Sequence, residues 1–247
     1  MAKYEYRSRI RYSECGEDSR LHLAGVVNYF QDTASFQGED LGIGVSWMKE
    51  RHLAWILVSW QIITDHMPRL GERVTVRTWP YSFNSFYGLR NLVLEDEEGH
   101  YAAWANSVWV LMDTKNRRPV KVSGEMAALY EQEKKLDMDY APRHIVPPAA
   151  GDTPEPFVIH RGHLDSNHHV NNGQYIQMAM EYLPADFRIY ETRVEYREQS
   201  FLGEMILPLV AREEDSVTVS LQKESGKVCA IVRFRSRSET DKGANHI

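Results

Sequence analysis

The fold is decided by one segment, His163-Leu164-Asp165-Ser166-Asn167-His168-His169-Val170-Asn171-Asn172-Gly173-Gln174-Tyr175. Within it, Asp165, Asn167 and His169 occupy alternate positions. Alternate side chains of an extended segment leave the backbone on the same side. We therefore expect these three polar side chains, called the polar trio below, to converge on one spot.

An amphipathic helix is predicted directly after the polar trio. Asn171 and Asn172 can serve as its N-cap, and Pro184 stops it. The apolar positions between them have the spacing of one buried helix face, and they are Tyr175, Met178, Ala179, Tyr182 and Leu183. The polar trio would then lie at a helix N-terminus, where the dipole can hold a developing negative charge. The plain alternative is a turn followed by a cap, with no chemistry.

Length and composition are those of an ordinary globular protein. The chain has 247 residues, of which 43% are hydrophobic and 26% charged, and its net charge is -6. The negative charge argues against general binding to nucleic acid. The longest apolar stretch, residues 53–63, is far shorter than the roughly 20 residues of a membrane helix. The N-terminus lacks the apolar core of a secretion signal, so we expect a cytoplasmic protein without a membrane span.

Neither the cysteines nor the histidines suggest a metal site. Cys15 and Cys229 form no Cys-x-x-Cys pair and cannot make a disulfide framework. The histidines near the polar trio match no standard zinc spacing, and they are His160, His163, His168 and His169. We expect no metal and no organic cofactor.

The chain contains the same unit twice, in the same order. Three pairs of segments match, and they are Asp18-Ser19-x-x-His22-Leu23 with Asp165-Ser166-x-x-His169-Val170, Leu70-Gly71-Glu72 with Leu202-Gly203-Glu204, and Leu94-x-x-Glu97-x-Gly99 with Leu221-x-x-Glu224-x-Gly226. Each copy reads as a strand, a helix and a meander of antiparallel strands. This is an α+β pattern in which a curved sheet wraps the helix. We expect domains over residues 1–122 and 157–240, joined by a linker over 123–156.

The string Asp165-x-Asn167-x-His169-Val170-Asn171-Asn172-x-x-Tyr175-Ile176 resembles the signature of the fatty acyl-acyl carrier protein thioesterases. Its His-Val-Asn-Asn-x-x-Tyr part is similar to the broader hot-dog thioesterase superfamily. In the first half, Gly88-Leu89-Arg90 and residues 105–121 are similar to that family's strands and the turn after them. The resemblance implies a tandem hot-dog fold, in which the first hot dog shapes the acyl pocket and the second is catalytic.

The activity that the resemblance implies is hydrolysis of the thioester between a fatty acyl chain and acyl carrier protein, a reaction of fatty acid biosynthesis. One position departs from the family pattern, because Gln199 stands where a catalytic Glu is expected. Ser200 stands where some members have a Cys, so a cysteine mechanism is excluded. Gln199 can orient a water molecule but cannot accept a proton at neutral pH.

Without a cysteine nucleophile, the mechanism left for this chain is attack by a water molecule that a general base activates. Asp165 and His169 are the candidate bases, and Asn167 with the backbone amides of Asn172 and Gly173 would stabilise the oxyanion. Glu198 is a further candidate for the base if the strand over residues 194–199 is regular, because strict alternation then points Glu198 rather than Gln199 inward. A β-bulge near residue 197 would instead direct Gln199 toward the site, and we favour the bulge.

Acyl carrier protein is the expected partner, and a basic run on this acidic chain could bind it. Its cations are Lys115, Arg117, Arg118 and Lys121. An ordinary solvated turn explains the run equally well. Two other functions stay open: an acyl-coenzyme A thioesterase, and a non-catalytic acyl-binding protein, which Gln199 favours. The oligomeric state also stays open, with a homodimer as one option.

Overall fold

A computed structural model describes residues 3–237 of the chain. Residues 1–2 and 238–240, included in the predicted domains, lie outside this range. The chain forms two compact units, one made of Met1–Val58 and Thr64–Ala141 and the other of Ser59–Ile63 and Pro142–Ile247. The first unit thus includes residues 123–141, which the sequence predicted as part of the linker. No helix in the described range is long and apolar enough to cross a membrane.

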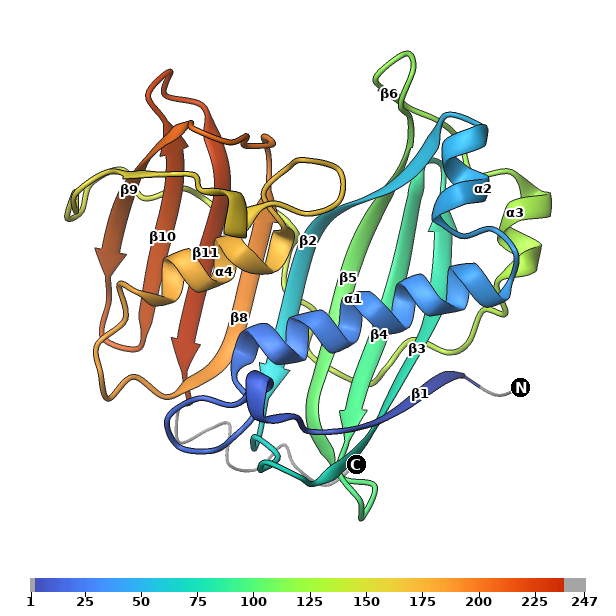
Figure 1. Cartoon of the computed structure of the whole chain (residues 1–247), viewed down its shortest axis with the longest axis horizontal. Helices are drawn as coiled ribbons and strands as arrows, with labels where there is room; N and C mark the ends of the chain where they lie inside the picture. The colour runs from blue at the N-terminus through green and yellow to red at the C-terminus, as the bar shows by residue number, and fades with distance from the viewer. Residues whose placement is uncertain (1–2, 238–247) are drawn as a thin grey trace. The chain divides into compact units, whose positions relative to one another are not determined.

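The first unit is an antiparallel sheet with one long helix across it. Its strands follow the order β1-β3-β4-β5-β2, and the bounds are β1 Tyr4–Arg9, β2 Leu53–Thr64, β3 Arg73–Asn84, β4 Tyr87–Glu95, β5 Tyr101–Asp113 and, paired with β5 alone, β6 Arg118–Pro119. Its helices are η1 Tyr12–Glu14, α1 Leu23–Asp40, α2 Val45–Glu50 and α3 Gly124–Leu129. Figure 1 shows α1 lying across the sheet. The buried face of α1 includes Val26, Val27 and Phe30, which have the spacing of one helix face.

The second unit repeats this arrangement. The Ser59–Ile63 part of β2 pairs with β8, and the order continues β8-β11-β10-β9-β7. The bounds are β7 Phe157–Val158, η2 Arg161–His163, α4 Asn172–Met180, β8 Ile189–Tyr196, β9 Met205–Arg212, β10 Ser216–Lys223 and β11 Val228–Ser236. Helix α4 packs on β10 and β11 (Figure 1). The predicted α+β class, with a sheet wrapped around a helix in each copy, is confirmed.

Helix α4 ends earlier than the sequence predicted. It stops at Met180 rather than continuing to Pro184. The N–H groups of Tyr182 and Leu183 donate to the carbonyls of Ala179 and Met180, which tightens the last turn. A residue before proline is also disfavoured in the helical conformation, so the chain leaves the helix before Pro184.

The duplication is visible in matching backbone hydrogen bonds. The Ile10 N–H donates to the Glu72 carbonyl at 2.9 Å, and the Ile159 N–H donates to the Glu204 carbonyl at 2.9 Å. Glycines with positive φ recur at the positions that the sequence matched, and they are Gly71 with Gly203 and Gly99 with Gly226. Turns that need a left-handed residue therefore recur at the same places in both copies.

The predicted match of Asp18 with Asp165 is wrong by two positions. A bridge joins Cys15 to Leu21 in the first copy and Leu164 to Val170 in the second, so Leu21 corresponds to Val170. The helix N-caps agree with this alignment, because His22 caps α1 and Asn171 caps α4. The sequence comparison paired Asp18, Ser19 and His22 with Asp165, Ser166 and His169 because the residues are identical, although they occupy different backbone positions in the two copies. The first-copy residues that correspond to Asp165, Asn167 and His169 are therefore Gly16, Asp18 and Arg20.

Candidate active site

The polar trio lies in a closed turn, not in the extended segment that the sequence predicted. The Asp165 N–H donates to the His169 carbonyl at 2.8 Å, and the His168 N–H donates to the Asp165 carbonyl at 3.1 Å. His168 has a φ of 63°, a left-handed conformation that reverses the chain. The side chains of Asp165 and His169 are half-buried, whereas Asn167 is exposed.

The Asp165 carboxylate fixes this turn. Its Oδ1 accepts the Asn167 N–H at 2.8 Å and the His169 N–H at 3.2 Å. An aspartate that binds backbone N–H groups a few residues ahead stabilises a turn in this way. Within residues 3–237, Oδ2 has no hydrogen-bond partner. One oxygen of the carboxylate is thus structural, and the other remains a proton acceptor.

The His169 ring is held by packing. Its centroid lies 5.1 Å from that of Phe201, with the two rings nearly perpendicular. In the described part of the chain, neither ring nitrogen has a hydrogen-bond partner. The turn is anchored beside this contact, because the Val170 N–H donates to the Ser200 carbonyl at 3.0 Å. Sequence reasoning missed Phe201, since it is distant from His169 along the chain and belongs to no motif.

Helix α4 begins where the trio ends. The Asn171 Oδ1 accepts the Gly173 N–H at 2.8 Å, which confirms the predicted N-cap. That bond uses the Gly173 N–H, so Gly173 is not the open oxyanion donor that the sequence predicted. The Asn172 carbonyl accepts a hydrogen bond from the Tyr196 hydroxyl at 2.9 Å.

The strand before Gln199 ends in a β-bulge, as favoured from the sequence. The N–H groups of Arg197 and Glu198 both donate to the Cys229 carbonyl, at 2.8 and 3.2 Å. A β-bulge is defined by two consecutive residues of one strand that lie opposite a single residue of the neighbouring strand. The Glu198 side chain is exposed and lies 3.3 Å from the Lys227 ammonium. Gln199 follows the bulge with an exposed side chain that has no partner among the described residues.

Ser200 is not arranged as a nucleophile. It is buried, its hydroxyl donates to the Cys229 sulfur at 3.0 Å, and its N–H donates to the Tyr175 hydroxyl at 3.1 Å. Burial raises the pKa of the Cys229 thiol and raises the pKa of Tyr175 to about 12. Both groups therefore stay neutral at neutral pH, and neither can activate the Ser200 hydroxyl.

The nearby histidines form part of the turn that precedes the trio. The His160 N–H donates to His163 Nδ1 at 3.1 Å, and the two ring centroids are 5.7 Å apart. Burial lowers the pKa of His163, which favours the neutral ring that accepts this bond. His168 is exposed. Over residues 3–237, no group of three or more His, Cys, Asp or Glu side chains could hold a metal ion.

The basic run forms an exposed hairpin between β5 and β6. Its four cations are exposed, and none has an acidic partner within 4 Å in the described chain; they are Lys115, Arg117, Arg118 and Lys121. Asp113 binds the Asn116 backbone N–H at 2.8 Å, which lowers the pKa of Asp113. Figure 1 shows this hairpin, near the β6 label, extending past the ends of its neighbouring strands. We call this segment, residues 115–121, the basic hairpin.

Comparisons with known proteins cover both halves of the chain. The model of the acyl-ACP thioesterase N-terminal domain matches residues 1–130, and that of the acyl-ACP thioesterase C-terminal domain matches residues 148–237. A palmitoyl-acyl carrier protein thioesterase of Gossypium hirsutum is 30% identical over 71% of this chain and 46% of the relative. One of Arabidopsis thaliana is 29% identical over 82% of this chain and 53% of the relative. Both are named as chloroplastic. The chain thus spans about half the length of these relatives.

Solved structures share the fold over nearly the whole chain. An acyl-ACP thioesterase of Bacteroides thetaiotaomicron has a TM-score of 0.87 and 21% identity, covering 94% of this chain and 97% of that one. The 12:0-ACP thioesterase of Umbellularia californica has a TM-score of 0.82 and 21% identity, covering 96% of this chain and 98% of that one. At this identity the likeness shows the fold, the tandem hot dog that the sequence predicted.

Proposed function

The chain belongs to the acyl-ACP thioesterase family, and on that premise we propose that it hydrolyses fatty acyl-acyl carrier protein to a free fatty acid and the carrier protein. The observation that carries this proposal is the turn at residues 165–169. There, Asp165 Oδ2 and the unprotonated ring nitrogen of a neutral His169 are proton acceptors without partners in the described chain, directly before the N-terminus of α4.

The proposed mechanism is attack by water on the thioester carbon. Asp165 Oδ2 or the His169 imidazole takes the proton of the attacking water as its oxygen bonds to the carbon. Asn167 donates its carboxamide N–H to the carbonyl oxygen, which becomes an oxyanion. A donor of this kind contributes about 3–4 kcal/mol to transition-state stabilisation in other hydrolases. Gln199, exposed after the bulge, orients the water by hydrogen bonding.

The intermediate then collapses by breaking its carbon–sulfur bond. The leaving thiolate of the carrier's prosthetic arm takes the proton that Asp165 or His169 received from the water, which restores the base, and the acyl group leaves as a carboxylic acid. The steps use only water and the residues named above, so the proposal includes no metal and no organic cofactor.

The test is turnover of an acyl carrier protein thioester by the purified chain. We expect Asn167→Ala and His169→Ala each to lower kcat at least about tenfold with an unchanged melting temperature, because each removes a transition-state contact rather than core packing. Ser166→Ala is the matched control, since Ser166 is an exposed residue of the same turn. Near-normal turnover in both site variants would remove the trio from the mechanism.

A second candidate is a non-catalytic acyl-binding protein, which the amide of Gln199 favours because it cannot accept a proton. The same assay separates the two functions. A wild-type chain that binds the acyl carrier protein thioester but does not release fatty acid would be the binding protein. Release of fatty acid that depends on Asn167 and His169 would exclude it.

A further inference from the structure

A buried cation of the first unit has no counter-charge among residues 3–237. Arg90 on β4 is only 8% exposed. Its Nη1 donates to Gln37 Oε1 at 2.5 Å and to Thr78 Oγ1 at 3.0 Å. Across residues 3–237, no carboxylate lies within 4 Å of the guanidinium, and Nε and Nη2 have no acceptor. A buried charge without a partner is unfavourable, so such groups usually have an ionic partner or a ligand.

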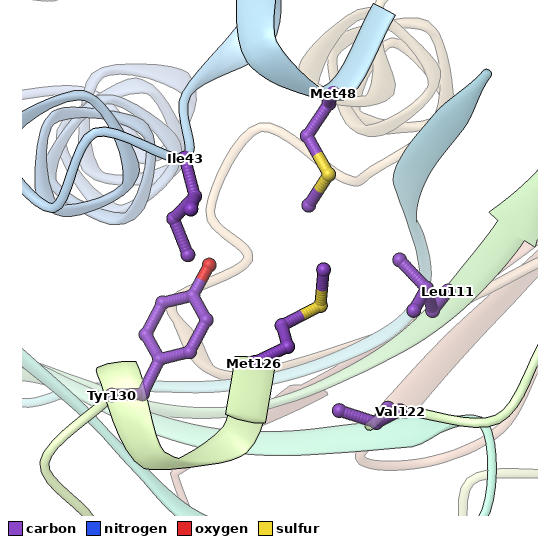
Figure 2. Packing of buried hydrophobic residues seen from close by; sticks show 6 residues of the cluster. All are labelled: Ile43, Met48, Leu111, Val122, Met126 and Tyr130. Carbon is purple, nitrogen blue, oxygen red and sulfur yellow. The ribbon is translucent and has the colours of Figure 1, made fainter. Parts of the chain in front are cut away.

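Arg90 borders the apolar cluster of the first unit. The guanidinium carbon is 5.6 Å from the centroid of the Tyr130 ring, and Tyr130 is part of the cluster. The buried members of this cluster point toward a common centre in Figure 2, and they are Ile43, Met48, Leu111, Val122, Met126 and Tyr130. The apolar cluster is therefore bordered by a cation.

A further donor lies at the same end of the cluster. The Trp55 Nε1–H is buried and has no hydrogen-bond acceptor in the part of the chain that the structure describes, although it approaches the Tyr130 hydroxyl. Trp55 and Tyr130 both pack on Phe83, with ring centroids 6.1 and 5.7 Å away. A buried indole N–H without an acceptor is unfavourable. Both unsatisfied groups are donors, so an acceptor would satisfy them.

We propose that this part of the first unit binds an aliphatic chain that ends in a carboxylate, with the carboxylate on Arg90. The proposal rests on the proposed function for its ligand class, because the product of that reaction is such a molecule. A guanidinium matches a carboxylate with two parallel hydrogen bonds, and the free Nε and Nη2 are the nitrogens that can form them. Burial lowers the pKa of Arg90 to about 10, which leaves it protonated at neutral pH.

The cluster is suited to the aliphatic part of this ligand. Met48 and Met126 direct their side chains toward its centre (Figure 2). Methionine side chains are flexible and adapt to an inserted chain. A ligand with a neutral end would leave the guanidinium without an anionic partner, so the acid should be preferred over an alcohol of equal length.

Binding of dodecanoate and of 1-dodecanol, below their aggregation limits, tests the proposal by calorimetry. We expect the wild-type chain to bind the acid at least about tenfold more tightly. Arg90→Gln should remove the preference for the acid, and Arg90→Lys should keep part of it. Tyr130→Phe should weaken the preference for the acid. Arg73→Gln is the control, since Arg73 is an exposed arginine on β3. Equal binding of acid and alcohol by the wild type overturns the proposal even if the Arg90 variants do not fold.

A carboxylate could also bind at the turn of residues 165–169, and two variants separate the sites. We expect Asn167→Ala and His169→Ala to keep the preference for the acid. If they lose it while Arg90→Gln keeps it, the carboxylate site is the turn and the proposal fails. Because binding is measured without turnover, this result is independent of whether the chain proves to be a thioesterase.

Two kinds of molecule supply a carboxylate for Arg90. One is a free fatty acid, and the other is a thioester whose acyl chain carries a second carboxylate at the end opposite the thioester. Pantetheine thioesters of dodecanoate and of dodecanedioate distinguish them. If the free acid is the ligand, dodecanoate inhibits turnover of the first thioester, and Arg90→Gln relieves the inhibition. If the far end is the ligand, the dicarboxylic thioester has the higher kcat/KM in the wild type and the lower one in Arg90→Gln.

Discussion

Asp165 holds the turn through Oδ1 and leaves Oδ2 without a hydrogen-bond partner in the described chain, and two substitutions test these two oxygens separately. Asp165→Ala leaves the N–H groups of Asn167 and His169 without their acceptor, and we expect it to lower the free energy of unfolding by about 1–3 kcal/mol. Asp165→Asn keeps an oxygen at the Oδ1 position, so we expect a change within about 0.5 kcal/mol. Urea denaturation measures both. Equal stability of the two variants would show that the turn does not depend on this carboxylate.

The turnover of stable Asp165→Asn then identifies the base. A side-chain amide cannot accept the proton from water. A large loss of kcat assigns that proton to Asp165, and near-normal turnover assigns it to His169.

The bulge before Gln199 leads to opposite expectations for two neighbouring residues. Glu198→Gln should leave turnover nearly unchanged, because the Glu198 carboxylate is exposed and pairs with Lys227. Gln199→Ala should lower turnover by releasing the water, whereas Gln199→Glu should keep or raise it. Steady-state kinetics on the three variants test this. Loss of turnover in Glu198→Gln alone would place the functional side chain one residue earlier.

The basic hairpin is the surface that would distinguish a carrier-protein substrate from a coenzyme A substrate. Lys115→Glu with Arg118→Glu reverses two exposed charges that have no acidic group within 4 Å in the described chain. We expect KM for the acyl carrier protein thioester to rise at least about tenfold at low salt, because an acidic partner loses its attraction. The acyl-coenzyme A thioester should change much less.

Lys134→Glu is the matched control for that experiment. Lys134 is also exposed in the first unit but lies outside the basic hairpin. If it raises KM for the carrier protein thioester as much as the hairpin variant does, net charge rather than the hairpin determines binding.

The two copies share a turn, but only the second has the polar trio. Asp18→Asn and Arg20→His introduce second-copy residues into the first copy, and we expect turnover to stay within about twofold. The reciprocal changes, Asn167→Asp and His169→Arg, should each lower kcat at least about tenfold. Melting temperatures must accompany the kinetics, since Arg20 donates to the Met67 carbonyl at 2.7 Å. A large loss of turnover in a stable first-copy variant would place catalytic residues in the first unit.

Sequence alone determined the elements and their repetition. Apolar spacing predicted the helix after residue 171, and the pair Asn171-Asn172 was recognised as holding its N-cap, which is Asn171, because capping is a local hydrogen bond. The matching glycines showed the duplication, since a left-handed turn needs the same residue in both copies. These features depend on residues that are neighbours in the chain.

Only the packed structure shows which hydrogen-bonding groups already have a partner and which do not. The Asp165 turn, the use of the Gly173 N–H by Asn171, and the bulge at residue 197 depend on which acceptor the folded backbone offers. For the bulge, that acceptor is the Cys229 carbonyl, which belongs to a different strand. The burial of Arg90 without a carboxylate also appears only when β3, β4 and α1 are packed together. Sequence patterns set local preference and apolarity, but hydrogen-bond partners distant in sequence are fixed only by packing.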